Sequence, residues 1–215
     1  LILRGGRVMC PVNGLDDVID LVIRDGRVEA LDATGVDGRV IDCSGLIVCR
    51  GFIDIGAELC DPGFTWREDL QTGSEAGAAG GFTTIVASPR TNPVIDTPTG
   101  VQEVAGRAAR LNGSRVLVSG ALTTNLDCEN MAELGLMLEA GAVALSDGRQ
   151  TMMNTGLLRR ALDYARPFGA PVLMRPGDIQ LEGAGVMHEG RISTEIGLRG
   201  IPAAAEEIGA ARLIA

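Results

Sequence analysis

The hydrophobic pattern of the chain changes near Ile47, and this change limits the folds that the chain can adopt. Before it, short β-rich runs are separated by turn signals such as Asp25-Gly26, which is typical of paired strands. After it, strand-like apolar runs alternate with segments of helical periodicity, which is typical of βα units around a parallel sheet. The pattern predicts an α/β chain with a small β portion at residues 1–48 and a βα portion at residues 49–215.

The βα portion contains five predicted strand–helix units. The predicted strands are Ile47–Ile55, Thr83–Ala87, Arg115–Gly120, Val143–Leu145 and Pro171–Met174, and the predicted helices are Glu68–Ala79, Thr99–Leu111, Glu129–Glu139, Met153–Phe168 and Ala203–Leu213. A closed (β/α) barrel needs eight such units, and an open arc leaves two strand edges unpaired. We therefore expect the sequence to be the N-terminal part of a chain roughly twice as long. A half-barrel completed by a partner is the alternative.

Composition excludes several classes of function. The net charge of −9 argues against a nucleic-acid partner, because phosphate binding requires a basic surface. All 19 basic residues are arginine, which excludes any mechanism that depends on lysine. Five widely spaced cysteines without a CxxC pair predict reduced thiols, and no run of 18 apolar residues occurs. These features together predict a cytoplasmic protein.

Three segments show a family resemblance. GFIDIGAELCDPG at residues 51–63 resembles GFIDxHxHLRxPG, the first-strand signature of dihydroorotases in the amidohydrolase superfamily. The segments at residues 73–98 and 141–178 resemble the dihydroorotase segments around GGFTT, TNP and the fourth and fifth strands, with one residue deleted near Gly148. The resemblance implies a TIM-like (β/α) amidohydrolase barrel, of which about the first five units are present, preceded by a small N-terminal β-sandwich portion.

The resemblance also shows which chemical groups are missing. The paired histidines that bind a metal in the family fall on Gly56 and Glu58, and two residues i and i+2 share one face of a strand. The arginine that binds the substrate carboxylate falls on Cys60. The first asparagine of the PNTNP turn falls on Arg90, although Asn92 is retained. Glycine has no ligand atom, and one carboxylate does not replace two imidazoles at zinc.

Two further site positions lie on later strands. The metal-binding aspartate of the family matches Asp147, and the fifth-strand histidine falls on Arg175. The remaining family ligands correspond to positions beyond Ala215. We therefore expect no zinc, and we expect Glu58, Arg175 and Asp147 to form an ion-pair network in the metal pocket.

Less specific interpretations of the same residues are open. Glu58 is alternatively a solvated carboxylate, and Asp147 a turn residue or a helix N-terminal acid. Cys60 is expected to be a packing residue rather than a nucleophile. His188, the single histidine, is expected at the surface and cannot rebuild a metal site.

Two functions of different classes follow from the resemblance. The first is a non-catalytic dihydroorotase-like pseudoenzyme of pyrimidine biosynthesis, a structural scaffold within an oligomer. The resemblance suggests aspartate transcarbamoylase as its partner, because dihydroorotase-like chains assemble with that enzyme in several bacteria; self-association is the alternative. The second is an active cyclic amidohydrolase with a remodelled metal site that uses Glu58 and Asp147. A weaker third interpretation is a sensor that binds a carboxylate through Arg90 and Arg175.

Overall fold

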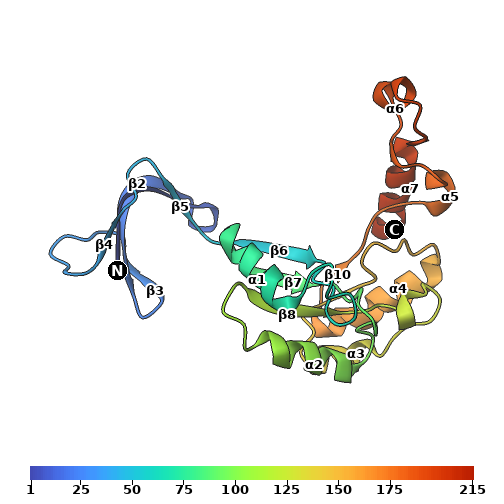
Figure 1. Cartoon of the computed structure of the whole chain (residues 1–215), viewed down its shortest axis with the longest axis horizontal. Helices are drawn as coiled ribbons and strands as arrows, with labels where there is room; N and C mark the ends of the chain where they lie inside the picture. The colour runs from blue at the N-terminus through green and yellow to red at the C-terminus, as the bar shows by residue number, and fades with distance from the viewer. The chain divides into compact units, whose positions relative to one another are not determined.

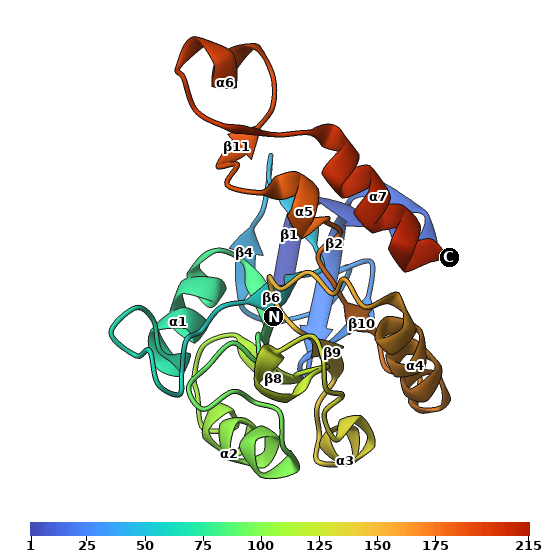
Figure 2. The ribbon, with the colours of Figure 1, turned by 90° about the vertical axis from the view of Figure 1, so that its right-hand side faces the viewer.

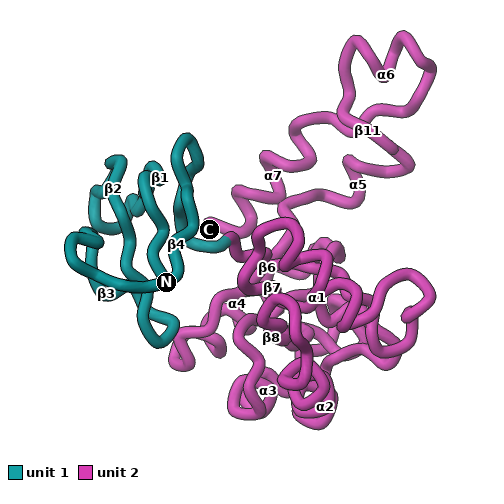
Figure 3. The backbone as a smooth tube through the Cα atoms, turned by 60° about the vertical axis from the view of Figure 1, so that its left-hand side comes forward, with its two compact units in different colours: residues 1–51 teal, residues 52–215 magenta.

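The computed structural model describes residues 1–215, and the chain divides into two compact units. The first comprises Leu1–Gly51 and the second Phe52–Ala215 (Figure 3). Each unit has its own cluster of buried apolar side chains. None of the helices combines the length and the apolar character that a membrane crossing requires.

The first unit is a five-stranded mixed sheet. Its strands are β1 (Ile2–Cys10), β2 (Leu15–Arg24), β3 (Arg27–Ala30), β4 (Val40–Asp42) and β5 (Ile47–Cys49), with a short 3₁₀ helix at Pro11–Asn13. Strands β1, β2 and β3 pair antiparallel, and β4 and β5 pair parallel with opposite ends of β1. The predicted turn at Asp25-Gly26 is confirmed, since both residues have positive φ and join β2 to β3.

The prediction of a single strand over Ile47–Ile55 is wrong. The structure has two strands here, β5 in the first unit and β6 (Phe52–Ala57) in the second. β5 pairs with β1, whereas β6 pairs with β7 (Phe82–Ala87). The apolar run is continuous because both of its halves are strands, and apolar periodicity alone does not show that they belong to different sheets.

The second unit contains the predicted parallel sheet. Strands β6, β7, β8 (Arg115–Gly120), β9 (Ala144–Ser146) and β10 (Val172–Leu173) lie side by side in chain order, and every pair is parallel. Helices α1 (Leu70–Ala79), α2 (Pro98–Ala108), α3 (Leu134–Glu139) and α4 (Thr155–Ala165) lie around the outside of the strands (Figures 1 and 2). This confirms the first five βα units of a TIM-like barrel.

The core of this unit lies between strands and helices. It is built from aliphatic side chains and methionines, among them Ile85, Val118, Val101, Leu134, Met137, Leu145 and Leu158. Each of these is nearly inaccessible to solvent. The packing fixes the strands against the outer helices, so that the carboxyl ends of the five strands form one rim, where active sites of such barrels lie.

Local signals explain where three of the four outer helices begin. Asp69 accepts the amide proton of Thr72 at the start of α1, Thr97 accepts that of Gly100 at α2, and Asn154 accepts that of Leu157 at α4. Such side-chain caps satisfy amide groups that have no partner within the helix. A 3₁₀ turn at Arg166–Phe168 follows α4.

The helix predicted over Glu129–Glu139 begins only at Leu134. The preceding residues pair with the loop after β8, which includes a 3₁₀ turn at Thr124–Leu126. Asn130 accepts a hydrogen bond from the amide of Thr124, and Ala132 donates one to Leu122. These tertiary hydrogen bonds replace the first helical turn, a competition that helix propensity does not report.

The region between Asp178 and the last helix has structure that the sequence patterns did not predict. It contains α5 (Ile179–Glu182), β11 (Met187–His188), α6 (Arg191–Glu195) and β12 (Gly200–Ile201), with β11 and β12 paired in parallel. The last helix, α7 (Ala203–Ile214), begins after Pro202 as predicted. Elements of two to five residues are too short to produce a recognisable period.

Candidate functional site

A cavity of about 280 Å³ lies at the carboxyl ends of strands β6 to β10. Three serines from adjacent strand ends, Ser88, Ser119 and Ser146, line it together with Gly56, Glu58, Arg149 and Arg175. Ile55, Leu173 and Met174 supply the apolar part of the cavity wall, and Gly148 completes the lining. The cavity occupies the part of a (β/α) barrel where substrates bind.

Glu58 forms the centre of one ion-pair group. Its Oε1 lies 2.6 Å from Nη1 of Arg90 and 3.4 Å from Nε of Arg149. The Glu58 side chain is only 21% exposed, whereas that of Arg149 is 77% exposed. The Glu58 carboxylate is therefore held in an ion pair with Arg90 and is not a solvated group at the strand end.

Glycine at position 148 makes room for Arg90. A Cβ atom there would lie 2.5 Å from Cδ of Arg90, and Gly148 also has a φ of +62°. The amide of Gly148 donates to Oγ of Ser146 at 2.9 Å. The loop after β9, in which Gly148 lies, therefore leaves space for the Arg90 side chain, which follows β7.

Arg175 belongs to a second, separate ion pair. Its Nη1 lies 3.0 Å from Oε2 of Glu182, and its Nη2 lies 2.9 Å from Oε1 of the same residue. Two contacts between a guanidinium and a carboxylate fix their relative orientation. Glu182 ends α5, so this pair joins the end of β10 to a helix that the sequence patterns did not predict.

Asp147 is buried and turned toward the loop after β8. Its Oδ1 accepts the amide protons of Leu122 at 2.8 Å and Thr123 at 2.9 Å, and its Oδ2 accepts the Thr123 hydroxyl at 2.6 Å. Burial raises the pKa of Asp147 above its ordinary value, although the hydrogen bonds from Thr123 and Leu122 act in the opposite direction. Asp147 is not among the residues that line the cavity.

The neighbouring thiol of Cys128 shares this environment. Burial, followed by the charges of Asp147 and Asp127, raises its pKa to about 11. The thiol is therefore protonated at neutral pH, and a protonated thiol is a poor nucleophile.

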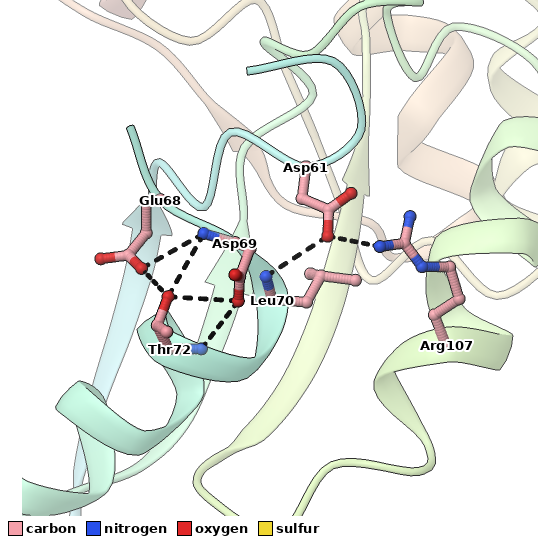
Figure 4. Close-up of polar contacts among 6 residues, drawn as sticks. All are labelled: Asp61, Glu68, Asp69, Leu70, Thr72 and Arg107. Atoms are coloured by element: carbon pink, nitrogen blue, oxygen red, sulfur yellow. Dashed lines mark hydrogen bonds and ion pairs between the residues drawn. The ribbon is translucent and has the colours of Figure 1, made fainter. Parts of the chain in front are cut away.

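Cys60 and Asp61 stabilise the loop that follows β6. Cys60 is buried, and its Sγ donates to the carbonyl oxygen of Glu58 at 3.4 Å. Asp61 accepts the amide proton of Leu70, the first residue of α1, and pairs with Arg107 of α2 (Figure 4). These contacts make the segment a structural link between β6 and two helices.

The same close-up shows how α1 begins. Thr72 contacts both Asp69 and Glu68, and the Asp69 amide in turn donates to Glu68 at 3.2 Å (Figure 4). The capping acids Glu68 and Asp69 thus fix the helix end that Asp61 also contacts.

The expected network of Glu58, Arg175 and Asp147 is wrong. Glu58 pairs with Arg90 and Arg149, and Arg175 pairs with Glu182. The Asp147 side chain accepts hydrogen bonds from the loop after β8, which includes the Cys128 thiol. Hydrogen bonds from two backbone amides hold the aspartate away from the rim. The sequence patterns did not predict a site role for Arg149 or Glu182. Arg149 follows the family position Asp147 by two residues, and this spacing is the signal that could have placed it near the rim.

The donor set does not fit a zinc ion. Gly56 has no ligand atom, Glu58 is paired with arginine, and Arg175 presents a positive charge at the cavity. No three histidine, cysteine, aspartate or glutamate side chains converge to hold a metal. His188 is exposed on β11. Structural and catalytic zinc sites need at least three such ligands.

Sequence comparisons identify the relatives of this chain. A family model described as Dihydro-orotase-like matches residues 45–214. A dihydroorotase of Syntrophotalea carbinolica is 41% identical over 214 residues, which cover 99% of this chain and 50% of that protein. A dihydroorotase of Citrifermentans bemidjiense is 43% identical over 215 residues, with 99% of this chain and 51% of that protein covered. The chain therefore spans about half the length of the curated relatives that it matches.

Several solved structures of hydantoinases have the same fold. The L-hydantoinase of Arthrobacter aurescens superposes with a TM-score of 0.72 at 23% identity, covering 98% of this chain and 49% of that one. The D-hydantoinase of Bacillus sp. AR9 gives a TM-score of 0.69 at 22% identity, covering 99% and 48%. At this identity the likeness concerns the fold alone. The sequence matches show that the chain belongs to the dihydroorotase-like family.

Proposed function

We propose that this protein is a non-catalytic dihydroorotase-like chain that acts as a structural scaffold. The observation that supports this most directly is the 2.6 Å ion pair between Glu58 and Arg90. Each of these residues stands where the family resemblance places a group of the active site, a metal ligand in one case and a substrate-binding amide in the other. In this chain the two residues at these positions form an ion pair with each other.

Loss of the metal ligands removes the nucleophile of the family reaction. A bound cation is what brings the pKa of water toward neutrality and so provides hydroxide. The positions that would hold it carry Gly56, an arginine-paired Glu58 and Arg175, and Asp147 faces another loop. The substrate-binding position at Cys60 is buried and contacts backbone.

The framework around these positions is intact, which agrees with selection for shape. The amide of Asn92 donates to the carbonyl oxygen of Pro62 at 3.0 Å, so the turn after β7 supports the turn after β6. Gly63 has a φ of +96°, and a Cβ there would overlap the Asn92 carbonyl. A scaffold needs these packing contacts and does not need the catalytic groups.

We propose aspartate transcarbamoylase, or a second copy of this chain, as the partner. This part of the proposal depends on the family resemblance. A partner that binds only the folded state is expected to stabilise this chain by mass action.

Metal content and activity of the full-length protein test the proposal. Purified without chelators, it should contain no stoichiometric zinc and should neither hydrolyse dihydroorotate nor cyclise carbamoyl aspartate above background. The matched variant combines Gly56→His, Glu58→His and Arg175→His, to restore ligands, with Cys60→Arg and Arg90→Asn, to restore substrate binding. Zinc in the wild type together with zinc-dependent turnover would establish a remodelled amidohydrolase and reject the scaffold.

A further inference from the structure

Two asparagines of this chain, Asn13 and Asn112, are each followed by a glycine. Both asparagine side chains are exposed to solvent. Because glycine has no Cβ, its amide nitrogen can approach the side-chain carbonyl carbon of the preceding asparagine closely. An asparagine in such a pair is therefore the one most easily attacked by its own backbone, and the conformation of the glycine decides whether the attack occurs.

The two pairs differ in what holds the glycine amide. The amide of Gly14 donates to the carbonyl oxygen of Pro11 at 3.2 Å and closes the 3₁₀ turn at Pro11–Asn13. The amide of Gly113, in the loop between α2 and β8, donates to no group of the chain. An amide that already donates must lose that hydrogen bond before its nitrogen can react. The structure therefore protects the first pair and leaves the second one reactive.

We propose that Asn112 is a modification site at which isoaspartate forms spontaneously. The amide nitrogen of Gly113 gives its proton to solvent hydroxide and attacks Cγ of Asn112, so that a bond between this nitrogen and Cγ forms. The bond between Cγ and Nδ2 breaks, and Nδ2 takes a proton from water and leaves as ammonia. Water then hydrolyses the cyclic imide at one of its carbonyl carbons, which yields aspartate or isoaspartate. The reaction needs neither a metal ion nor a partner, so it goes beyond the scaffold role.

Isoaspartate at this position disturbs the junction between α1 and β8. It carries the main chain through Cγ and so lengthens it by a methylene group directly before Gly113. A Cβ atom at Gly113 would lie 2.5 Å from the carbonyl carbon of Ser74 in α1, so the two backbones already touch. Ser114 is bonded on both sides, from its amide to the Ser74 oxygen at 3.0 Å and from its hydroxyl to the Phe82 oxygen at 2.6 Å. A junction packed this closely cannot take up an added methylene without displacement.

Peptide mapping of the full-length protein, aged in mildly alkaline buffer, tests the proposal. Trypsin cleaves after arginine, so Asn112 falls in the peptide 111–115 and Asn13 in the peptide 8–24, and neither peptide contains another asparagine. Mass spectrometry should show isoaspartate forming in 111–115 about fivefold faster or more, as expected when one hydrogen bond protects the other pair. Equal rates, or a faster reaction in 8–24, would overturn the inference.

Protein unfolded in urea in the same buffer is the control for structure. Unfolding releases both glycine amides, so the two peptides should then react at similar rates. A difference that persists in urea would assign the selectivity to the local sequence and reject the role of the fold.

Asn112→Gln and Asn13→Gln are the matched variants. Glutamine has a longer side chain and forms the ring poorly, so Asn112→Gln should block the reaction in 111–115, whereas Asn13→Gln should leave it unchanged. Ageing should lower the thermal unfolding midpoint of the wild type and of Asn13→Gln, but not that of Asn112→Gln. A midpoint that falls equally in all three, or that stays constant while isoaspartate accumulates, would show that the junction between α1 and β8 is not disturbed by it.

Discussion

Asp147 holds the loop after β8 through a buried carboxylate. Two backbone amides and one hydroxyl donate to it, and these donors belong to Leu122 and Thr123. The residue that the family resemblance assigns to a metal thus has a structural role here that needs no metal. Its retention is explained by these hydrogen bonds.

Asp147→Asn should change how stability depends on pH. Burial raises the pKa of Asp147 in the folded state, so the folded protein binds this proton more tightly than the unfolded chain does. The stabilisation is complete below the unfolded pKa and is lost as pH rises through the raised folded pKa. Urea unfolding of both proteins from pH 4 to pH 8 should therefore show the asparagine variant gaining stability relative to the wild type as pH rises.

Asp147→Ala provides the comparison. It leaves two buried amide protons without an acceptor and should lower the free energy of unfolding by about 2–4 kcal/mol. Equal stability of the alanine and asparagine variants would show that the carboxylate does not hold this loop.

At the level of elements, Asp61 connects three of them. Its side chain is 4% exposed, follows β6, accepts the first amide of α1 and pairs with Arg107 of α2 (Figure 4). Arg107→Ala should leave a buried carboxylate without its cation and lower the free energy of unfolding by about 1–3 kcal/mol, since Arg107 is itself 43% exposed. Urea denaturation measures this.

Arg159→Ala is the control for this change. It removes an exposed pair within α4 and should alter the free energy of unfolding by less than about 0.5 kcal/mol. If Arg107→Ala and Arg159→Ala change the free energy of unfolding equally, the buried Asp61 carboxylate does not need the Arg107 guanidinium for stability.

The last helix is attached through a close approach of two glycines. A Cβ atom on Gly209 of α7 would overlap the backbone of Gly177, and Arg212 one turn later donates to the carbonyl oxygen of Gly177 at 3.0 Å and pairs with Asp178 at 2.8 Å. Gly209→Ala should therefore push α7 outward and lower the free energy of unfolding by about 1–3 kcal/mol.

Gly106→Ala on α2 tests the same substitution where there is room. No atom lies within 4 Å of a Cβ at this position, so alanine should stabilise by about 0.5–1 kcal/mol through helix propensity. Unfolding experiments on the two variants should give opposite signs. A stabilising Gly209→Ala would show that α7 does not pack on Gly177.

At the scale of the whole molecule, periodicity predicted the parallel sheet because each strand and its helix bury one continuous apolar face. It did not predict α5 to β12, whose elements are too short to show a period, or the split between β5 and β6. Motif spacing placed Glu58 and Arg175 at the cavity. It did not predict their partners, because Arg90 and Arg149 lie on loops and Glu182 lies on the short helix α5, and the positions of all three depend on tertiary packing.

The proposed partner belongs to this scale. We predict that the full-length protein purifies from its native cell as an oligomer with the catalytic chain of aspartate transcarbamoylase. Deletion of this chain should then lower the transcarbamoylase activity or the thermal stability of that enzyme, because a partner that binds only the folded state shifts the unfolding equilibrium. Size-exclusion chromatography and activity measured in the deletion strain provide the test.

Complementation separates the scaffold from catalysis in that strain. Asp147→Ala, which should loosen the loop after β8, is expected to restore the partner less well than the wild type. Glu58→Gln changes only the former active site, whose carboxylate pairs with Arg90 and Arg149, and should restore it fully. A protein that elutes alone as a monomer, and whose deletion leaves transcarbamoylase unchanged, would exclude this partner, because an interface selected in place of catalysis must affect the chain that it binds.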